Sequence, residues 1–150
     1  MIKRSNHCPG FLYFSYLILC ISCIIFSPPL LAADMVIIAN KNVPDDSLTK
    51  EDIKQIFLGK KKKWKDNSPI TVVLAKTGEA HTELLTKYID RTPSQFNNVW
   101  KRLVFTGEAI YPTSFSNDSK VIDFVSSRKG AIGYVISNHP PNNIKIIKTE

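Results

Sequence analysis

Cysteine is absent from most of this 150-residue chain. The three cysteines, Cys8, Cys20 and Cys23, all lie near the amino terminus. The remainder can therefore form no disulfide framework, thiol nucleophile or Cys-ligated zinc site. Glycine is scarce too, with 6 residues and no GxGxxG, GxSxG or phosphate-loop pattern. These absences argue against dinucleotide-binding, serine-hydrolase and nucleotide-hydrolysing proteins.

Histidines and paired acids offer no catalytic or metal-binding arrangement. Beyond residue 33 the histidines are His81 and His139, and neither has a metal-ligand spacing. We expect such a lone histidine to be a surface or helix-start residue. Asp45-Asp46 and Glu51-Asp52 are explained by turn and helix-start chemistry. We therefore predict a protein that is not an enzyme, with no catalytic residues, no metal and no cofactor.

The segment 1–33 has the pattern of a secretory signal peptide. Lys3 and Arg4 are its only charged residues, an apolar run covers 11–26, and the prolines at 28–29 break any helix. The apolar run is also shorter than the roughly 20 residues of a membrane-spanning helix.

We predict cleavage after Ala33, which leaves a periplasmic domain at residues 34–150 with no stable membrane span. A retained membrane anchor is the first alternative. A lipoprotein signal at Cys23 is the second.

Basic residues outnumber acidic ones, 20 against 13, so the chain should attract anionic partners. The densest basic segment is Lys60–Lys63 with Lys65, around Trp64. This pattern is more typical of a solvated loop than of a docking patch. Because no ladder of aromatic residues accompanies it, we expect no nucleic-acid binding.

Short apolar runs alternate with amphipathic segments along residues 34–150. Two helix starts are clearly marked, by Thr49 with Asp52 and by Thr92 with Pro93 and Gln95. Strands separated by helices predict an α/β fold. We expect strands at 35–39, 70–74, 131–136 and 144–147, and helices that start near 49, 79, 92 and 116.

One segment carries candidate binding chemistry, namely Lys76–Thr82, which joins an expected buried strand to an expected helix. Free backbone N–H groups at a helix start favour an anion, and ligands bind at this edge of open α/β sheets. Gly78 allows close approach, Thr77 and Thr82 add hydroxyls, and Lys76 adds charge. The alternative is a plain turn in which Thr77 only caps the helix, because Glu79 already places an anion there.

Three segments resemble phosphate-binding periplasmic proteins of ABC transporters. Leu48–Lys60 followed by Trp64 resembles their "L-s-x-e-x-x-x-I-F-x-G-k-x-x-x-W" stretch. Trp100–Gly107 is similar to "W-x-x-x-x-F-T-G", and Gly130–Val135 is similar to a strand that contains "G-A-I-G-Y". The order and spacing match over most of residues 34–150.

The resemblance implies an α/β fold of the type 2 periplasmic-binding-protein class, as a single lobe with a small mixed sheet flanked by helices. It also implies an oxyanion held without covalent chemistry. The family's "R-x-x-G-S-G-T" loop falls on Leu74–Thr82, so that the implied ligand-binding residues are Lys76, Thr77, Gly78 and Thr82. No arginine stands at Leu74 or Ala75, and the family's early Gly-Ser-Thr loop is replaced by 40–43.

Two functions follow from this resemblance. The first is a solute-binding protein for phosphate or another small oxyanion, with an ABC permease or another envelope protein as its partner. The second is a periplasmic protein-interaction module that has lost the ligand. In that case the Lys60–Trp64 loop or the Tyr111–Phe115 segment would meet another envelope protein.

Overall fold

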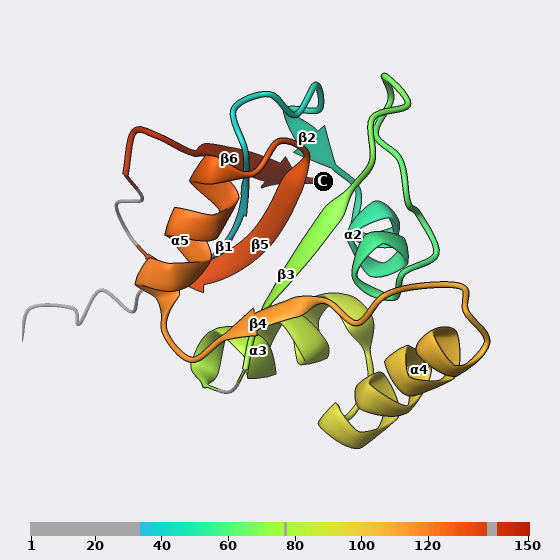
Figure 1. Ribbon diagram of the computed structural model, residues 1–150. Coiled ribbons are helices and arrows are strands. Elements are labelled where there is room, and N and C mark those ends of the chain that lie inside the picture. Colours follow the sequence, from blue (N-terminus) through green and yellow to red (C-terminus); the bar gives the residue numbers. More distant parts are fainter. Residues whose placement is uncertain (1–33, 77, 138–140) are drawn as a thin grey trace, which may run out of the picture. The chain divides into compact units, whose positions relative to one another are not determined.

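The computed structural model describes residues 34–76, 78–137 and 141–150. The expected signal peptide at 1–33 therefore lies outside the described residues, as do Thr77 and His139. Six strands form a mixed sheet in the order β2-β6-β1-β5-β3-β4 (Figure 1). The strands are β1 (Met35–Ala39), β2 (Ser47–Leu48), β3 (Thr71–Ala75), β4 (Thr113–Phe115), β5 (Ala131–Ile136) and β6 (Lys145–Thr149).

Helices connect these strands and cover both faces of the sheet. They are α2 (Lys50–Phe57), α3 (Glu79–Leu84), the π-helical turn η1 (Leu85–Ile89) that continues α3, α4 (Pro93–Phe105) and α5 (Asp118–Ser127). In the part of the chain that the structure describes, no helix is long and apolar enough to cross a membrane.

Strand β1 lies inside the sheet and runs antiparallel to both neighbours, β5 and β6. Strand β3 runs parallel to β5 and to the edge strand β4, and β2 runs parallel to β6. Parallel and antiparallel pairs in one sheet confirm the expected mixed α/β architecture.

The continuous apolar run of β1 is explained by burial on both faces. Ile37 belongs to the larger core cluster, and the next residue, Ile38, belongs to the smaller cluster beneath α5. Successive side chains of a strand point to opposite faces, so a strand covered on both sides needs apolar residues throughout.

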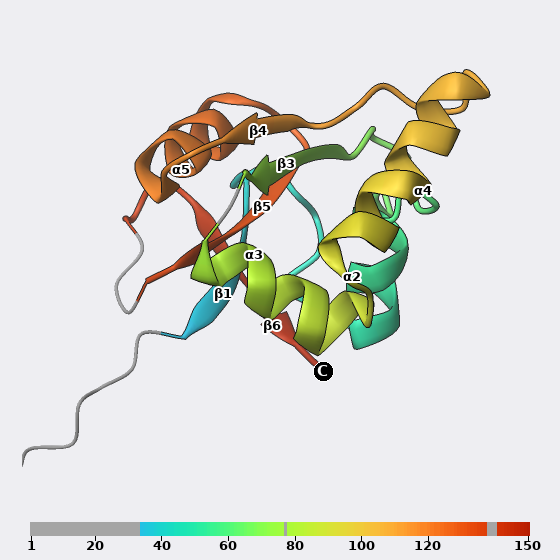
Figure 2. The same ribbon diagram turned by 90° about the horizontal axis from the view of Figure 1, so that it is seen from below.

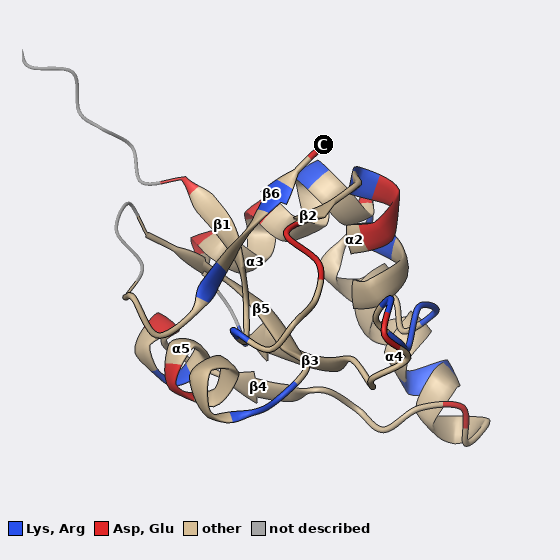
Figure 3. Ribbon diagram, turned by 90° about the horizontal axis from the view of Figure 1, so that it is seen from above, with Lys and Arg blue, Asp and Glu red and all other residues tan. Residues whose placement is uncertain are grey.

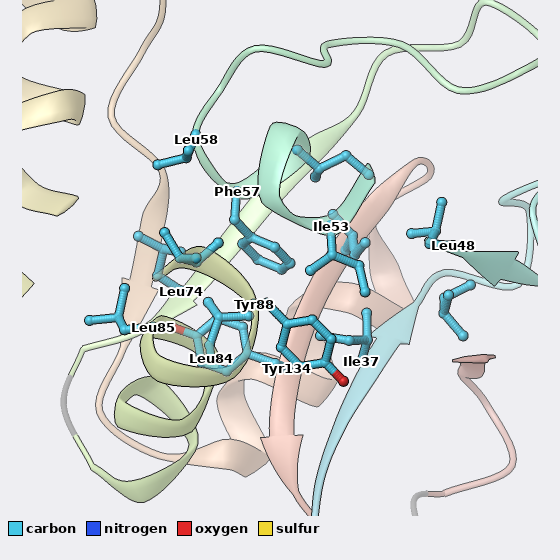
Figure 4. Close-up of a cluster of buried hydrophobic side chains, with 14 of the residues drawn as sticks. Ile37, Leu48, Ile53, Phe57, Leu58, Leu74, Leu84, Leu85, Tyr88 and Tyr134 are labelled. Atoms are coloured by element: carbon cyan, nitrogen blue, oxygen red, sulfur yellow. The ribbon is translucent and has the colours of Figure 1, made fainter. Parts of the chain in front are cut away.

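Two layers of helices enclose the sheet (Figure 2). Helices α2, α3 and α4, with η1, contribute to the larger cluster, whose centre is shown in Figure 4. Helix α5 covers the opposite face with Val121 and Val125. The indole N–H of Trp100 on α4 donates to the carbonyl oxygen of Phe57 at the end of α2, at 3.1 Å.

The helix starts follow the expected capping chemistry. In α2, the Asp52 N–H donates to Thr49 Oγ1 at 3.1 Å and the Thr49 N–H donates to Asp52 Oδ2 at 3.3 Å. In α4, Thr92 and Gln95 form the same reciprocal pair, with Pro93 at the first helical position. Both predicted helix starts are confirmed.

Two short edge strands were not expected. Strand β2 has two residues and β4 has three, and hydrophobic periodicity cannot mark such short segments. Strand β4 matters for the site because its carbonyl at Phe115 accepts a hydrogen bond from the Lys76 N–H at 2.7 Å. This contact fixes the backbone where β3 ends.

Candidate functional site

The loop after β3 brings the predicted binding residues to the carboxyl end of the strand. Gly78 precedes α3 with φ of 111°, in the left-handed half of conformational space that only glycine adopts readily. The Gly78 carbonyl accepts hydrogen bonds from the N–H and the hydroxyl of Thr82, both at 3.1 Å. The Thr82 hydroxyl proton is therefore engaged inside the helix, and its oxygen retains only acceptor capacity.

Backbone N–H groups remain available at this loop. Gly78 and Glu79 are exposed, and their N–H groups form no backbone hydrogen bond with another described residue. The Lys76 N–H differs, because it is bound to the carbonyl of Phe115. Among the described residues, these two amides and the Lys76 ammonium group have no hydrogen-bond partner.

A pocket of about 510 Å³ lies against this loop. Three of the four predicted residues, Lys76, Gly78 and Thr82, line it, while Thr77 lies outside the described residues. The other lining residues come from β3, α3, α4 and the segment through β4, and they are Leu74, Ala75, His81, Pro93, Phe96, Asn97, Tyr111 and Ser114.

His81 lies in the first turn of α3, in agreement with the expected helix-start position, but it is not a simple surface residue. Its ring is half-buried, and Nδ1 lies 2.6 Å from the hydroxyl oxygen of Tyr134 on β5. The rings of His81 and Phe96 pack edge to face, with centroids 5.7 Å apart. Burial lowers the pKa of His81 from its ordinary value near 6.5, so the imidazole is neutral at neutral pH.

Tyr134 holds this histidine from inside the sheet. Its side chain is fully buried in the larger core cluster (Figure 4), and burial raises the pKa of the phenol well above its ordinary range. The hydroxyl accepts a hydrogen bond from the Ala75 N–H at 3.0 Å. Tyr134 therefore joins β5 to two residues that line the pocket, Ala75 at the end of β3 and His81 on α3.

The charge in the pocket is low. Lys76 is the one formally charged residue of the described lining, and Glu79 lies exposed in the first turn of α3. An adjoining pocket shares Thr82 and Pro93 and contains Arg91 and Asp90, whose opposite charges offset each other. Among the residues that the structure describes, no cluster of His, Cys, Asp and Glu could hold a metal ion.

The segment 40–43, which stands in place of the family's early phosphate loop, has a structural role at its first residue. Asn40 is buried, and its Nδ2 donates to the carbonyl oxygens of Val125 and Ser126 at 2.8 and 2.9 Å. Its Oδ1 accepts a hydrogen bond from the Asn42 N–H. Asn40 thus binds the carboxyl end of α5 with its amide N–H₂ and binds Asn42 with its amide oxygen.

Sequence reasoning missed the residues that reach the pocket from other elements. Asn97 lies on α4, Tyr111 precedes β4 and Ser114 lies within it, and no local motif marks any of them. For His81, its place three residues after Gly78 was a usable signal. Its Tyr134 partner, 53 residues away, was not visible in the sequence.

In this fold, a mixed α/β sheet presents a strand-to-helix loop to a cavity. A family model described as the PBP superfamily domain matches residues 25–148, and the chain belongs to this family. The match begins within the expected signal peptide. No curated protein sequence in the comparison matches the chain.

Solved structures of phosphate-binding proteins have a similar fold. A putative phosphate ABC transporter substrate-binding protein from Clostridium perfringens, with bound phosphate, has a TM-score of 0.60 at 20% identity, covering 77% of this chain and 44% of that chain. PstS from Borrelia burgdorferi has a TM-score of 0.59 at 14% identity, and the match covers 77% of this chain and 47% of that chain. An ABC-type phosphate transport receptor from Vibrio cholerae gives 0.53 at 16% identity, covering 77% and 45%.

The matched part of this chain thus spans less than half the length of these proteins. Together with the family match, the likeness confirms the predicted fold, a short relative of the phosphate-binding proteins.

Proposed function

We propose that the chain is an exported, non-catalytic solute-binding protein that captures phosphate or another small oxyanion. The ligand lies in the pocket of about 510 Å³ beside Lys76, Gly78 and Thr82. Thr77, between Lys76 and Gly78, is the fourth proposed ligand-binding residue. The observation that carries the proposal is that Lys76 and Gly78 line one cavity, at the edge where open α/β sheets bind ligands.

Family membership and fold support this function. The chain belongs to the PBP superfamily domain family, and the titles of similar structures describe phosphate transport receptors. A small anion would enter with its charge toward Lys76 and accept hydrogen bonds from the Gly78 and Glu79 amides. An ABC permease or another envelope protein would then receive the ligand.

Calorimetric titration with phosphate tests the proposal. The protein is purified after expression of the full-length chain, and saturable heat is expected. Lys76→Gln should weaken binding, whereas Lys120→Gln, an exposed lysine of α5 on the opposite face, should leave it unchanged. No heat with phosphate, sulfate or any other anion would contradict the proposal.

Export is tested on the same preparation. Expression in a Gram-negative host should place the protein in the periplasm with Asp34 as its first residue, which intact-mass measurement can read. A mass that retains residues 1–33 would favour the membrane-anchor alternative.

A second candidate function is a protein-interaction module, and an exposed apolar tip favours it. Phe105 at the end of α4 and Ile110 beyond it are 92% and 91% exposed. Lys62 Nζ bonds to the carbonyl of Glu108 at 2.7 Å, which places the lysine-rich loop beside this tip (Figure 3). Trp64 takes no part, because its ring is buried and its Nε1–H donates to the Gly130 carbonyl at 3.1 Å.

Photo-crosslinking in cells distinguishes this candidate. A crosslinking amino acid at Phe105 should capture a defined envelope protein if the tip is a docking site. The same group at Ile146, a half-exposed residue of β6, serves as the control. Equal crosslinking at the two positions would contradict a docking site at the tip.

A further inference from the structure

A second groove, of about 450 Å³, lies beside the start of β3. Its walls come from the lysine-rich loop, from the first residues of β3 and from the segment 108–113 that leads into β4. Among the described residues it shares only Tyr111 with the pocket beside Lys76. The groove is therefore separate from the site of oxyanion capture. Its role rests on the second candidate function, a protein-interaction module, and assigns a chemical class to the partner.

The apolar side of this groove is accessible to a partner. Ile110 is 91% exposed and Tyr111 is 43% exposed, and both line the groove. Ile70 and Val72 are half-buried and line it from the other wall. Ile110 also belongs to the exposed apolar tip, so the groove continues that surface. A partner that covers these side chains removes apolar area from water.

Pairing between β3 and β4 stops short of the start of β3. It begins with Val73 opposite Thr113. The residue before Thr113 is Pro112, which has no N–H to extend the ladder. Thr71 and Val72 are therefore paired with β5 on one side and with no strand on the other.

This open edge leaves one backbone donor at the groove. The Thr71 N–H donates to the Gly130 carbonyl at 3.0 Å, on the side of β5. Successive N–H groups of a strand point to opposite neighbours, so the Val72 N–H points to the open edge. It forms no hydrogen bond with any residue in the described ranges. A carbonyl group of an extended peptide can accept this bond, as in strand addition.

Positive charge surrounds the groove. Lys61, Lys62 and Arg128 line it, against one acidic residue, Glu108. Lys61 is paired with Asp52 at 2.8 Å, whereas Lys62 Nζ is bonded to a neutral group, the Glu108 carbonyl. Arg128 is exposed, and its guanidinium has no partner in the part of the chain that the structure describes. Two cations are thus available to carboxylates of a partner.

We infer that this groove binds an extended acidic peptide, a segment of a partner protein that carries an apolar side chain between acidic ones. The apolar side chain lies against Ile110 and Val72. The flanking carboxylates lie beside Lys62 and Arg128, and a peptide carbonyl accepts the Val72 N–H.

A labelled synthetic peptide tests this by fluorescence anisotropy with protein purified after expression of the full-length chain. The peptide has valine and isoleucine at its centre and acidic residues at both ends, and saturable binding is expected. Replacing its acidic residues with lysine, or its centre with serine, should weaken binding at least about tenfold. Absence of binding, or equal binding of either altered peptide, would overturn the inference. Displacement of the peptide by single-stranded oligothymidylate more readily than by unlabelled peptide would also overturn it.

Substitutions at exposed positions locate the bound peptide. Arg128→Gln and Ile110→Ser should each weaken it about fivefold to tenfold. Lys120→Gln and Ile146→Ser, which are exposed positions outside the groove, should leave its affinity unchanged. Lys76→Gln should also leave it unchanged, although that substitution weakens phosphate. Unchanged affinity in both Arg128→Gln and Ile110→Ser would overturn the inference.

Amide hydrogen exchange, measured by NMR, tests the backbone contact. In the free protein the Val72 amide should exchange at least about tenfold faster than the Thr71 amide, because only the Thr71 amide has an acceptor. Saturation with the acidic peptide should slow Val72 and leave Thr71 unchanged. Equal exchange of the two amides in the free protein, or no slowing of Val72, would contradict the extended arrangement. A crosslinked partner at Phe105 without peptide binding would overturn this inference alone, and absence of both would refute the second candidate function as well.

Discussion

The phenolic oxygen of Tyr134 lies 2.6 Å from Nδ1 of His81, and this contact joins a strand inside the sheet to the helix that borders the pocket. Both side chains are shielded from solvent, His81 in part and Tyr134 completely. An imidazole in this position is easier to bury neutral than charged. The contact therefore links the protonation of the site to the stability of the fold.

Stability should depend on pH through His81. Its pKa is lowered in the folded protein from an ordinary value near 6.5, so the unfolded chain binds the proton more readily. The free energy of unfolding should therefore be at its full value above about pH 6.5 and fall as the pH drops through the lowered pKa. Urea unfolding at about pH 7.5 and pH 5 measures this difference, in a range above the titration of the carboxylates.

His81→Gln should lose less stability over the same interval, because glutamine takes up no proton. His139→Gln is the matched control for the general effect of removing a histidine. Equal losses in the unmodified protein and in His81→Gln would show that His81 does not cause the pH dependence of stability.

Gly130 should tolerate no side chain. Its φ is +71°, and a Cβ atom there would lie 2.3 Å from the carbonyl oxygen of Pro69, while its own carbonyl accepts the Trp64 indole N–H. Gly130→Ala should lower the free energy of unfolding by about 2–4 kcal/mol, since it combines a clash with backbone strain.

Gly107 has almost the same φ, +72°, and a Cβ atom there would have nothing within 4 Å. Gly107→Ala should therefore cost only about 1 kcal/mol, and equal losses in urea unfolding would show that the Pro69 contact is unimportant.

Asn40 should be needed for folding. Its Nδ2 makes two hydrogen bonds to carbonyl oxygens at the end of α5, and the side chain is only 4% exposed. Asn40→Asp replaces this donor with a buried charge that faces two carbonyls, so a loss of about 3 kcal/mol or more is expected. Asn98→Ala, at an exposed position of α4, should cost less than about 1 kcal/mol. A normal unfolding midpoint for Asn40→Asp would show that this end of α5 does not depend on the amide.

The parts of the fold that sequence predicts well are those determined by neighbouring residues. Capping boxes at Thr49 and Thr92 depend on contacts three residues apart, and both occur. Apolar runs such as 35–39 and 131–136 report burial directly, because an inner strand needs apolar side chains on both faces. The π-helical turn at Leu85–Ile89 was not predicted, since its residues have the same inward-facing pattern as an α-helix.

The candidate site was only partly predictable, because some of its residues are near one another in the sequence and others are not. Lys76 and Gly78 lie in the loop after β3 and Thr82 lies in α3, and all three line one pocket. Asn97 and Ser114 reach that pocket from elements far along the chain, and only the tertiary fold brings them there.

The exposed tip of α4 should be dispensable for stability and needed for contact with a partner. Phe105 and Ile110 are more than nine-tenths exposed, so replacing both with serine removes little buried area and should change the free energy of unfolding by less than about 0.5 kcal/mol. Both residues belong to one connection at the end of α4, and a contiguous exposed apolar patch marks a contact surface. The double variant should therefore lose any partner that co-purifies with the unmodified protein, or any self-association seen by sedimentation.

Ile146→Ser, at a half-exposed position of β6, is the control variant, and it should keep the same association. Unchanged association in the double variant would show that the tip is simply solvated, and would leave the pocket as the site to which function must be assigned.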